Sequence, residues 1–144
     1  MILLNEFSEG VVTRNADESI LWGEKLGFHL NFGTTIALYG DLGTGKTTFA
    51  KGLAAGLGIK ETVKSPTYGI YTIYKSGNMP FVHVDAYRLE NPDHFEDLLI
   101  DEIVADPKIL CIEWPEKIGD NLPLNAIKLS FSIKKDGSHL IKMI

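Results

Sequence analysis

The sequence is poor in several residue types, and each shortage narrows the functions it can have. Cys111 is the only cysteine in 144 residues, so an intrachain disulfide is excluded. No apolar run approaches the ~18 residues of a membrane span, and residues 1–15 lack the basic segment and apolar core of a signal peptide. We therefore expect a cytoplasmic protein with no membrane partner.

Positive charge is also scarce. Arginine occurs only at positions 14 and 88, and the net charge is −5. A protein that binds nucleic acid by itself normally presents a basic face, because neutralising phosphates supplies much of the affinity. The composition therefore argues against a stand-alone nucleic-acid binder, although a local basic patch is compatible with an acidic total.

One glycine-rich segment carries the strongest chemical signal. Residues 40–47, GDLGTGKT, match the pattern G-x-x-x-x-G-K-[ST] of a phosphate-binding loop (P-loop). Glycines let successive backbone N–H groups turn toward one anion. Lys46 supplies a positive charge for the outer phosphates, and the Thr47 hydroxyl can bind Mg²⁺. The pattern predicts that residues 1–144 form a single P-loop ATPase domain.

The surrounding periodicity agrees with this motif. An apolar run at 35–39 predicts a buried strand before the loop, and helical spacing of apolar residues at 47–57 predicts a helix after it. Another helix is expected after Asn15, and a further one is expected to begin at Asn91-Pro92 and continue past Ile103. Further strands are predicted at 10–14, 69–75, 81–84, 108–113, 126–133 and 139–144. Residues 69–75 and 81–84 form a predicted hairpin with no helix between them. We therefore expect an α/β, three-layer P-loop fold with a mixed parallel and antiparallel central sheet.

Two apolar strands of this scheme end in an acid. Residues 81–84 lead into Asp85, and residues 109–112 lead into Glu113. Mg²⁺ prefers carboxylate and other oxygen ligands, and such acids lie at the carboxyl ends of strands beside the loop. We favour Glu113 for Mg²⁺, while Asp85 can orient the attacking water or share the metal.

Other candidates carry weaker signals. Thr67, in the segment Ser-Pro-Thr, can reach the γ-phosphate or its metal, although such a segment is by itself most often a simple turn. Arg88 is compatible with a phosphate contact or with a structural ion pair. Trp114 is interpreted as a packing residue at the end of a strand rather than a ligand.

Four motifs together resemble the bacterial TsaE proteins. They are GDLGTGKTTF at 40–49, SPTY at 65–68, HVDAYRL at 83–89 and EWPE at 113–116, in the order and at about the spacing of that family. The resemblance covers residues 10–125. TsaE proteins are small ATPases required to make threonylcarbamoyladenosine beside the anticodon of tRNAs that read codons beginning with A.

The resemblance implies specific roles for residues of this sequence. ATP would be held by the loop, and Thr47 and Glu113 would bind Mg²⁺, with Asp85 as a second candidate. Lys46, Thr67, Asp85 and Glu113 would support hydrolysis. The expected partners are the TsaD and TsaB proteins as a heterodimer, with tRNA contacted only indirectly through the complex. The implied ATP-binding residues are Asp41, Leu42, Gly43, Thr44, Gly45, Lys46, Thr47 and Thr48.

Two other functions remain open from the sequence. A small P-loop kinase would need a water-excluding lid with cationic groups, which two arginines and no long insertion do not favour. A nucleotide-sensing module that does not hydrolyse ATP is the third reading. The sequence does not determine the oligomeric state.

Overall fold

The computed structural model describes residues 2–66 and 69–144, and within them seven strands form one mixed sheet. The spatial order is β1-β7-β6-β2-β5-β4-β3. The four central strands β6, β2, β5 and β4 pair in parallel, and antiparallel pairs complete both edges. The predicted mixed sheet is confirmed. The strands are β1 (Val11–Thr13), β2 (Thr34–Tyr39), β3 (Tyr71–Tyr74), β4 (Phe81–Asp85), β5 (Ile109–Glu113), β6 (Ile127–Ile133) and β7 (His139–Met143).

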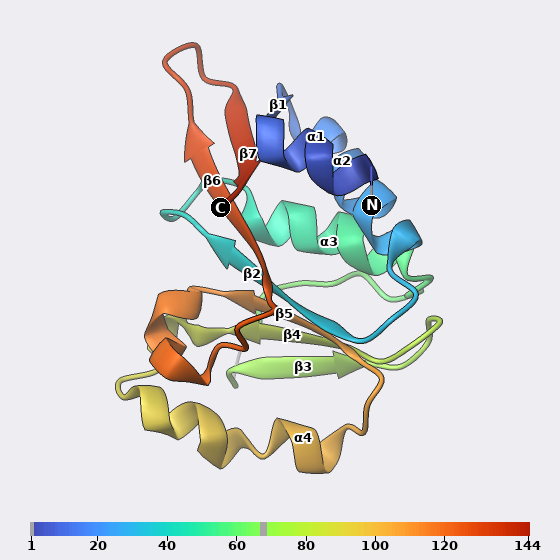
Figure 1. Cartoon of the computed structure of the whole chain (residues 1–144), viewed down its shortest axis with the longest axis vertical. Coiled ribbons are helices and arrows are strands. Elements are labelled where there is room, and N and C mark those ends of the chain that lie inside the picture. Colours follow the sequence, from blue (N-terminus) through green and yellow to red (C-terminus); the bar gives the residue numbers. More distant parts are fainter. Residues whose placement is uncertain (1, 67–68) are drawn as a thin grey trace.

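Helices on both faces of the sheet make three layers (Figure 1). The three longer helices pack on one face, and the short helices pack on the other. Among the described residues, none of the helices has both the length and the hydrophobicity to cross a membrane. The helices are α1 (Ile2–Glu9), α2 (Ala16–His29), α3 (Lys46–Gly56) and α4 (Ile100–Ile103), with 3₁₀ helices η1 (Ala86–Arg88), η2 (Pro92–Leu98) and η3 (Pro115–Asn121).

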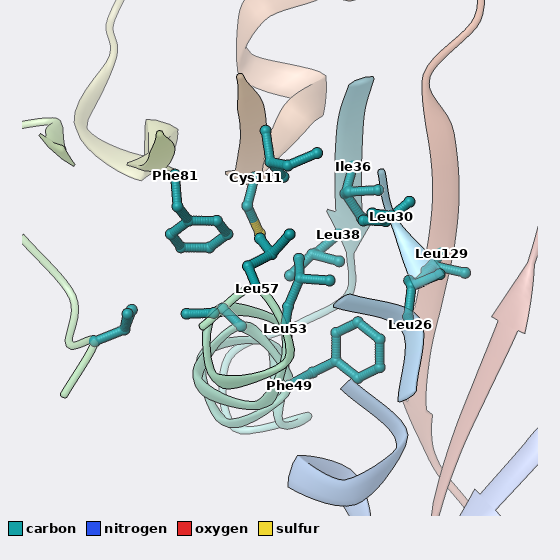
Figure 2. Close-up of a cluster of buried hydrophobic side chains, with 14 of the residues drawn as sticks. Leu26, Leu30, Ile36, Leu38, Phe49, Leu53, Leu57, Phe81, Cys111 and Leu129 are labelled. Carbon is teal, nitrogen blue, oxygen red and sulfur yellow. The ribbon is translucent and has the colours of Figure 1, made fainter. Parts of the chain in front are cut away.

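The larger core lies between α3 and the central strands (Figure 2). Phe49, Leu53 and Leu57 point from this helix toward the sheet and are buried. Cys111 lies in the same cluster, as its apolar surroundings in the sequence predict, and burial raises the pKa of its thiol well above the usual value. This core fixes the orientation of the helix that follows the phosphate-binding loop.

Close contact between α2 and α3 adds to that restraint. Asn15 caps α2 as predicted, with its side-chain oxygen accepting from the Glu18 N–H at 2.9 Å. At Gly52, a Cβ atom would stand 2.1 Å from the carbonyl oxygen of Ile20, so only glycine permits the observed approach of the two backbones. Gly52 is therefore needed for the packing of α2 against α3.

The sequence predicts one continuous helix from Asn91-Pro92, and this is wrong because the structure has two short helices there. Asn91 caps the first turn by accepting from the Asp93 N–H at 3.0 Å. The segment is then a 3₁₀ helix to Leu98, and Leu99 takes a left-handed conformation with φ 54° before the single turn of α4. Phe95 and Leu98 are partly buried against the second core, whereas Leu99 and Ile103 are about half exposed, so the apolar spacing identified only part of the packed face.

Helix α1 was not predicted. Its buried side chains, Leu3 and Phe7, are four residues apart and join the larger core. Phe7 packs edge-on against Trp22 and Phe49, with ring centroids 5.7 and 6.0 Å away. The helix has only eight residues, which is shorter than the window of about 11–18 residues over which helical spacing of apolar residues can be recognised.

We predict that Gly52→Ala destabilises the fold by about 1–3 kcal/mol, because overpacking forces the two helices apart. Alanine is the better helix former by about 1 kcal/mol, so propensity alone predicts the opposite sign. Urea unfolding of this variant and of a control at an exposed α3 position, Lys51→Ala, provides the measurement. A Gly52→Ala midpoint equal to or above wild type would contradict the contact.

Candidate functional site

The glycine-rich segment connects β2 to α3 as the motif requires. β2 ends at Tyr39 and α3 begins at Lys46. Gly45 has φ 98°, and at Gly40 a Cβ would lie 2.6 Å from the carbonyl oxygen of Phe131. The loop conformation therefore depends on glycine at these two points. The predicted order of strand, glycine-rich turn and helix is confirmed.

Lys46 is folded back onto the loop. Its ammonium donates hydrogen bonds to the carbonyl oxygens of Gly40 and Asp41 and lies 3.9 Å from the ring centroid of Trp114. Burial lowers the pKa of this ammonium, and the negative charge of Glu113 opposes that shift. The site thus presents a lysine whose present partners are main-chain carbonyls and an indole face, all of which an anion can replace.

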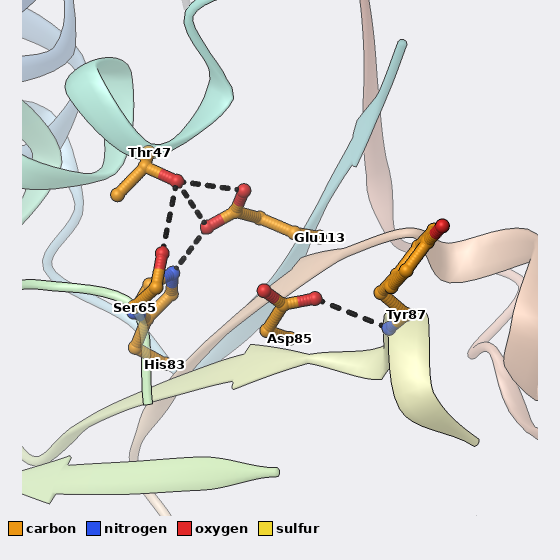
Figure 3. Close-up of polar contacts among 6 residues, drawn as sticks. All are labelled: Thr47, Ser65, His83, Asp85, Tyr87 and Glu113. Carbon is orange, nitrogen blue, oxygen red and sulfur yellow. Dashed lines mark hydrogen bonds and ion pairs between the residues drawn. The ribbon is translucent and has the colours of Figure 1, made fainter. Parts of the chain in front are cut away.

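The two strand-end acids stand next to each other across neighbouring strands. Asp85 of β4 is the register partner of Glu113 of β5. The Thr47 hydroxyl lies 2.9 and 3.0 Å from the two carboxylate oxygens of Glu113 (Figure 3). Asp85 accepts a hydrogen bond at 3.1 Å from the Tyr87 N–H and so caps η1. Hydroxyl and carboxylate oxygens converge here, and these are the atoms that Mg²⁺ prefers.

His83 also contacts the Glu113 carboxylate. His83 is fully buried, and its Nε2 lies 2.6 Å from Oε2 of Glu113. Ser65 lies at the edge of the group, with its hydroxyl 3.5 Å from that of Thr47. Glu113 is itself only 3% exposed, so its carboxylate depends on these neighbours for hydrogen bonds.

Thr47, Ser65, Asp85 and Glu113 border a cavity of about 370 Å³. This volume falls within the range of small-molecule sites. Its lining residues are Arg14, Asn15, Ala16, Ser19, Leu42, Gly43, Thr44, Gly45, Lys46, Thr47, Thr48, Ser65, Asp85, Glu113, Trp114 and His139.

Most of the predicted site residues therefore meet in one place. Leu42 to Thr48, Asp85 and Glu113 all line the cavity, while Asp41 contributes its carbonyl to Lys46 and Thr44. Thr67 lies outside the described residues. Arg88 does not belong to the set that lines this cavity. Trp114 has φ 59° and contacts Lys46 and Tyr87, so it is part of the site wall as well as a packing residue.

The sequence interpretation missed several residues of the site. Neither His83 nor His139 is among the residues that the sequence predicts for the site. For His139 the reason is the pairing of β1 with β7, in which Thr13 lies opposite His139, so that His139 and the start of α2 reach the same cavity. No local pattern indicates such a pairing. The spacing of His83 two residues before an acid on a buried strand was the available signal for that residue.

Comparison with known proteins identifies the family. The profile of the family "Threonylcarbamoyl adenosine biosynthesis protein TsaE" matches residues 13–141. This chain belongs to the TsaE family. A relative in Treponema pallidum, named tRNA threonylcarbamoyladenosine biosynthesis protein TsaE, is 37% identical over 90% of this chain and 96% of its own length. A protein of the same name in Bacillus subtilis is 44% identical over 73% of this chain and 64% of its own length.

A solved structure supports the fold assignment. The crystal structure of Bacillus subtilis YdiB superposes with a TM-score of 0.73 and 27% sequence identity, covering 93% of this chain and 82% of that one. The TsaE family is a tRNA-modification family with a P-loop-like fold, and such a fold suggests nucleotide binding.

The Lys46–Trp114 contact can be tested without any ligand. The protein has two tryptophans, so Trp22→Phe isolates Trp114. In that background we predict that Lys46→Met changes the emission of Trp114, because the ammonium no longer lies over the indole face. Lys51→Met, on the exposed side of α3, is the matched control. Identical spectra for Lys46→Met and its parent would show that the ammonium does not rest on the ring.

Proposed function

We propose that this chain is the Mg²⁺-dependent ATP-binding and ATP-hydrolysing subunit needed to form the threonylcarbamoyl group on adenosine beside the anticodon of tRNAs that read codons beginning with A. It acts with the TsaD and TsaB proteins. The observation that carries the proposal is the contact of Thr47 with both oxygens of Glu113, 2.9 and 3.0 Å away, beside Lys46 in one cavity. Family membership supplies the pathway.

The donor set fits a magnesium ion. Thr47 and Glu113 offer one hydroxyl and two carboxylate oxygens, and Asp85 offers a second carboxylate at the adjacent strand end. Mg²⁺ typically takes one or two carboxylates and completes its coordination with water and phosphate oxygens. The bound ion would neutralise the charge that develops on the outer phosphates during hydrolysis.

The loop and Lys46 would bind the phosphates. The loop N–H groups and the beginning of α3 provide donors and the positive end of a helix dipole. Lys46 would exchange the carbonyl oxygens of Gly40 and Asp41 for phosphate oxygens, and so place its charge where negative charge grows. The phosphate oxygens would therefore replace the loop carbonyl oxygens as hydrogen-bond acceptors of Lys46.

Asp85 is the proposed water-orienting group. Its Oδ1 is engaged by the Tyr87 N–H at 3.1 Å, which fixes the carboxylate at the cavity wall. The other oxygen can accept a proton from an attacking water. Thr67 is proposed to assist at the γ-phosphate, as switch residues do.

The negative charge of the chain agrees with a complex in which other subunits bind the tRNA. At −5, it lacks the overall basic character with which proteins usually hold nucleic acid by themselves. TsaD and TsaB are proposed to hold the tRNA, and this subunit would use ATP hydrolysis to reset the complex between turnovers.

Hydrolysis measured with and without purified TsaD–TsaB tests the function. We expect complex formation and an increase in the ATPase rate. A rate unchanged by the partners, with no complex detected, would contradict the assignment. Transfer of phosphate to an added nucleoside, sugar or peptide would instead indicate the kinase alternative.

Two substitutions test the residue roles in the same assay. Lys46→Ala and Glu113→Ala should each reduce hydrolysis by at least ~10²-fold, because each removes charge compensation at the transferring phosphate. Lys51→Ala and Glu102→Ala, exposed on α3 and α4, serve as controls. A near-normal rate in either site variant would refute the role of that residue.

A further inference from the structure

His83 and Glu113 form an unusually buried polar contact beside the cavity. His83 is 0% exposed and Glu113 is 3% exposed, and their Nε2 and Oε2 atoms are 2.6 Å apart. The register partner of His83 on β5 is Cys111, so the imidazole reaches along the strand to the next residue on the same face (Figure 3). This direct contact is made to Oε2, the carboxylate oxygen that also lies 3.0 Å from the Thr47 hydroxyl.

The geometry also places the imidazole proton. Nδ1 of His83 is buried and has no hydrogen-bond partner among the described residues. An ionised carboxylate can only accept hydrogen bonds, so the proton in the contact with Oε2 comes from Nε2, whereas a proton on Nδ1 would leave a buried N–H without an acceptor. The tautomer with its proton on Nε2 therefore fits, and that N–H donates to Oε2 of Glu113.

A purely space-filling role does not explain the histidine. His83 lies stacked near Phe81, with ring centroids 6.4 Å apart, at the edge of the larger core. An apolar side chain at this point would leave no buried nitrogen unsatisfied. The contact with Glu113 is the hydrogen bond found for this imidazole among the described residues, and it ends on the proposed magnesium ligand.

We propose that His83 is a positioning residue: its Nε2–H fixes the Glu113 carboxylate so that both oxygens face Thr47 and the magnesium site. The inference rests on the proposed function. Hydrogen bonds from the surrounding protein orient carboxylate ligands, and losing one typically lowers metal affinity or activity by about 10–100-fold. His83 itself is not among the residues that line the cavity.

Two amide substitutions of His83 test whether the hydrogen bond to Glu113 matters, apart from the presence of a polar side chain. In His83→Gln, the side-chain nitrogen can occupy the place of Nε2 and donate to Glu113. In His83→Asn, the shorter amide reaches only the place of Nδ1. Both variants put a neutral amide into the same buried position, so they differ chiefly in whether the donor reaches Oε2 of Glu113.

The measurement is binding of a fluorescent ATP analogue at increasing Mg²⁺ concentration, with a metal-free titration beside it. We expect His83→Asn to raise the Mg²⁺ concentration at half-effect by about 10–100-fold, with metal-free nucleotide binding unchanged. His83→Gln should stay close to wild type. Equal Mg²⁺ dependence in wild type and His83→Asn would overturn the proposal. Equal impairment of both variants, accompanied by weaker metal-free binding and lower thermal stability, would also overturn it by indicating a structural role.

A ligand-free readout separates this inference from the proposed function. ¹⁵N NMR of the histidine rings at one pH should show His83 as the Nε2–H tautomer, with a signal that moves in Glu113→Ala and is absent in His83→Gln. The Nδ1–H tautomer, or no response to Glu113→Ala, would refute the contact. Wild-type protein that binds no nucleotide with Mg²⁺ would instead refute the proposed function and the role of His83 toward the metal, even with the contact intact.

Discussion

The parallel register of β2, β5 and β4 is the constraint on which the site depends. Leu38 pairs with Glu113, and Glu113 pairs with Asp85, so the carboxyl ends of these three strands lie side by side. The loop leaves β2 at that edge, and α3 starts beside the two acids. A shift of one residue in any of these pairings would turn a carboxylate to the opposite face. The chemistry of the cavity is therefore set by strand pairing before any single side chain is considered.

The charged groups of the site have partners within the protein. Lys46 is held by carbonyl oxygens of the loop and by the face of Trp114, while Glu113 is held by Thr47 and His83. An uncompensated buried charge would destabilise the fold. A metal and a polyphosphate that bind here would therefore have to replace these contacts with stronger ones.

Much of the fold and part of the site could be predicted from the sequence. The loop, its flanking strand and helix, the hairpin of β3 and β4, and the acids that end β4 and β5 all follow from local spacing, because these signals act over a few residues. The continuous helix after Asn91 was wrong, because Leu99 takes a left-handed conformation that interrupts the helix. Helix α1 has only eight residues, too few for its apolar spacing to be recognised. His139 and the start of α2 reach the cavity only through the pairing of β1 with β7, a long-range contact that no local pattern encodes.

The most direct test is a crystal structure with Mg²⁺ and a non-hydrolysable ATP analogue. We expect the Lys46 ammonium to leave the carbonyl oxygens of Gly40 and Asp41 for the outer phosphates, with Mg²⁺ between Thr47 and the Glu113 carboxylate. Electron density that leaves Lys46 on those carbonyls, with the triphosphate bound away from Thr47 and Glu113, would contradict the interpretation.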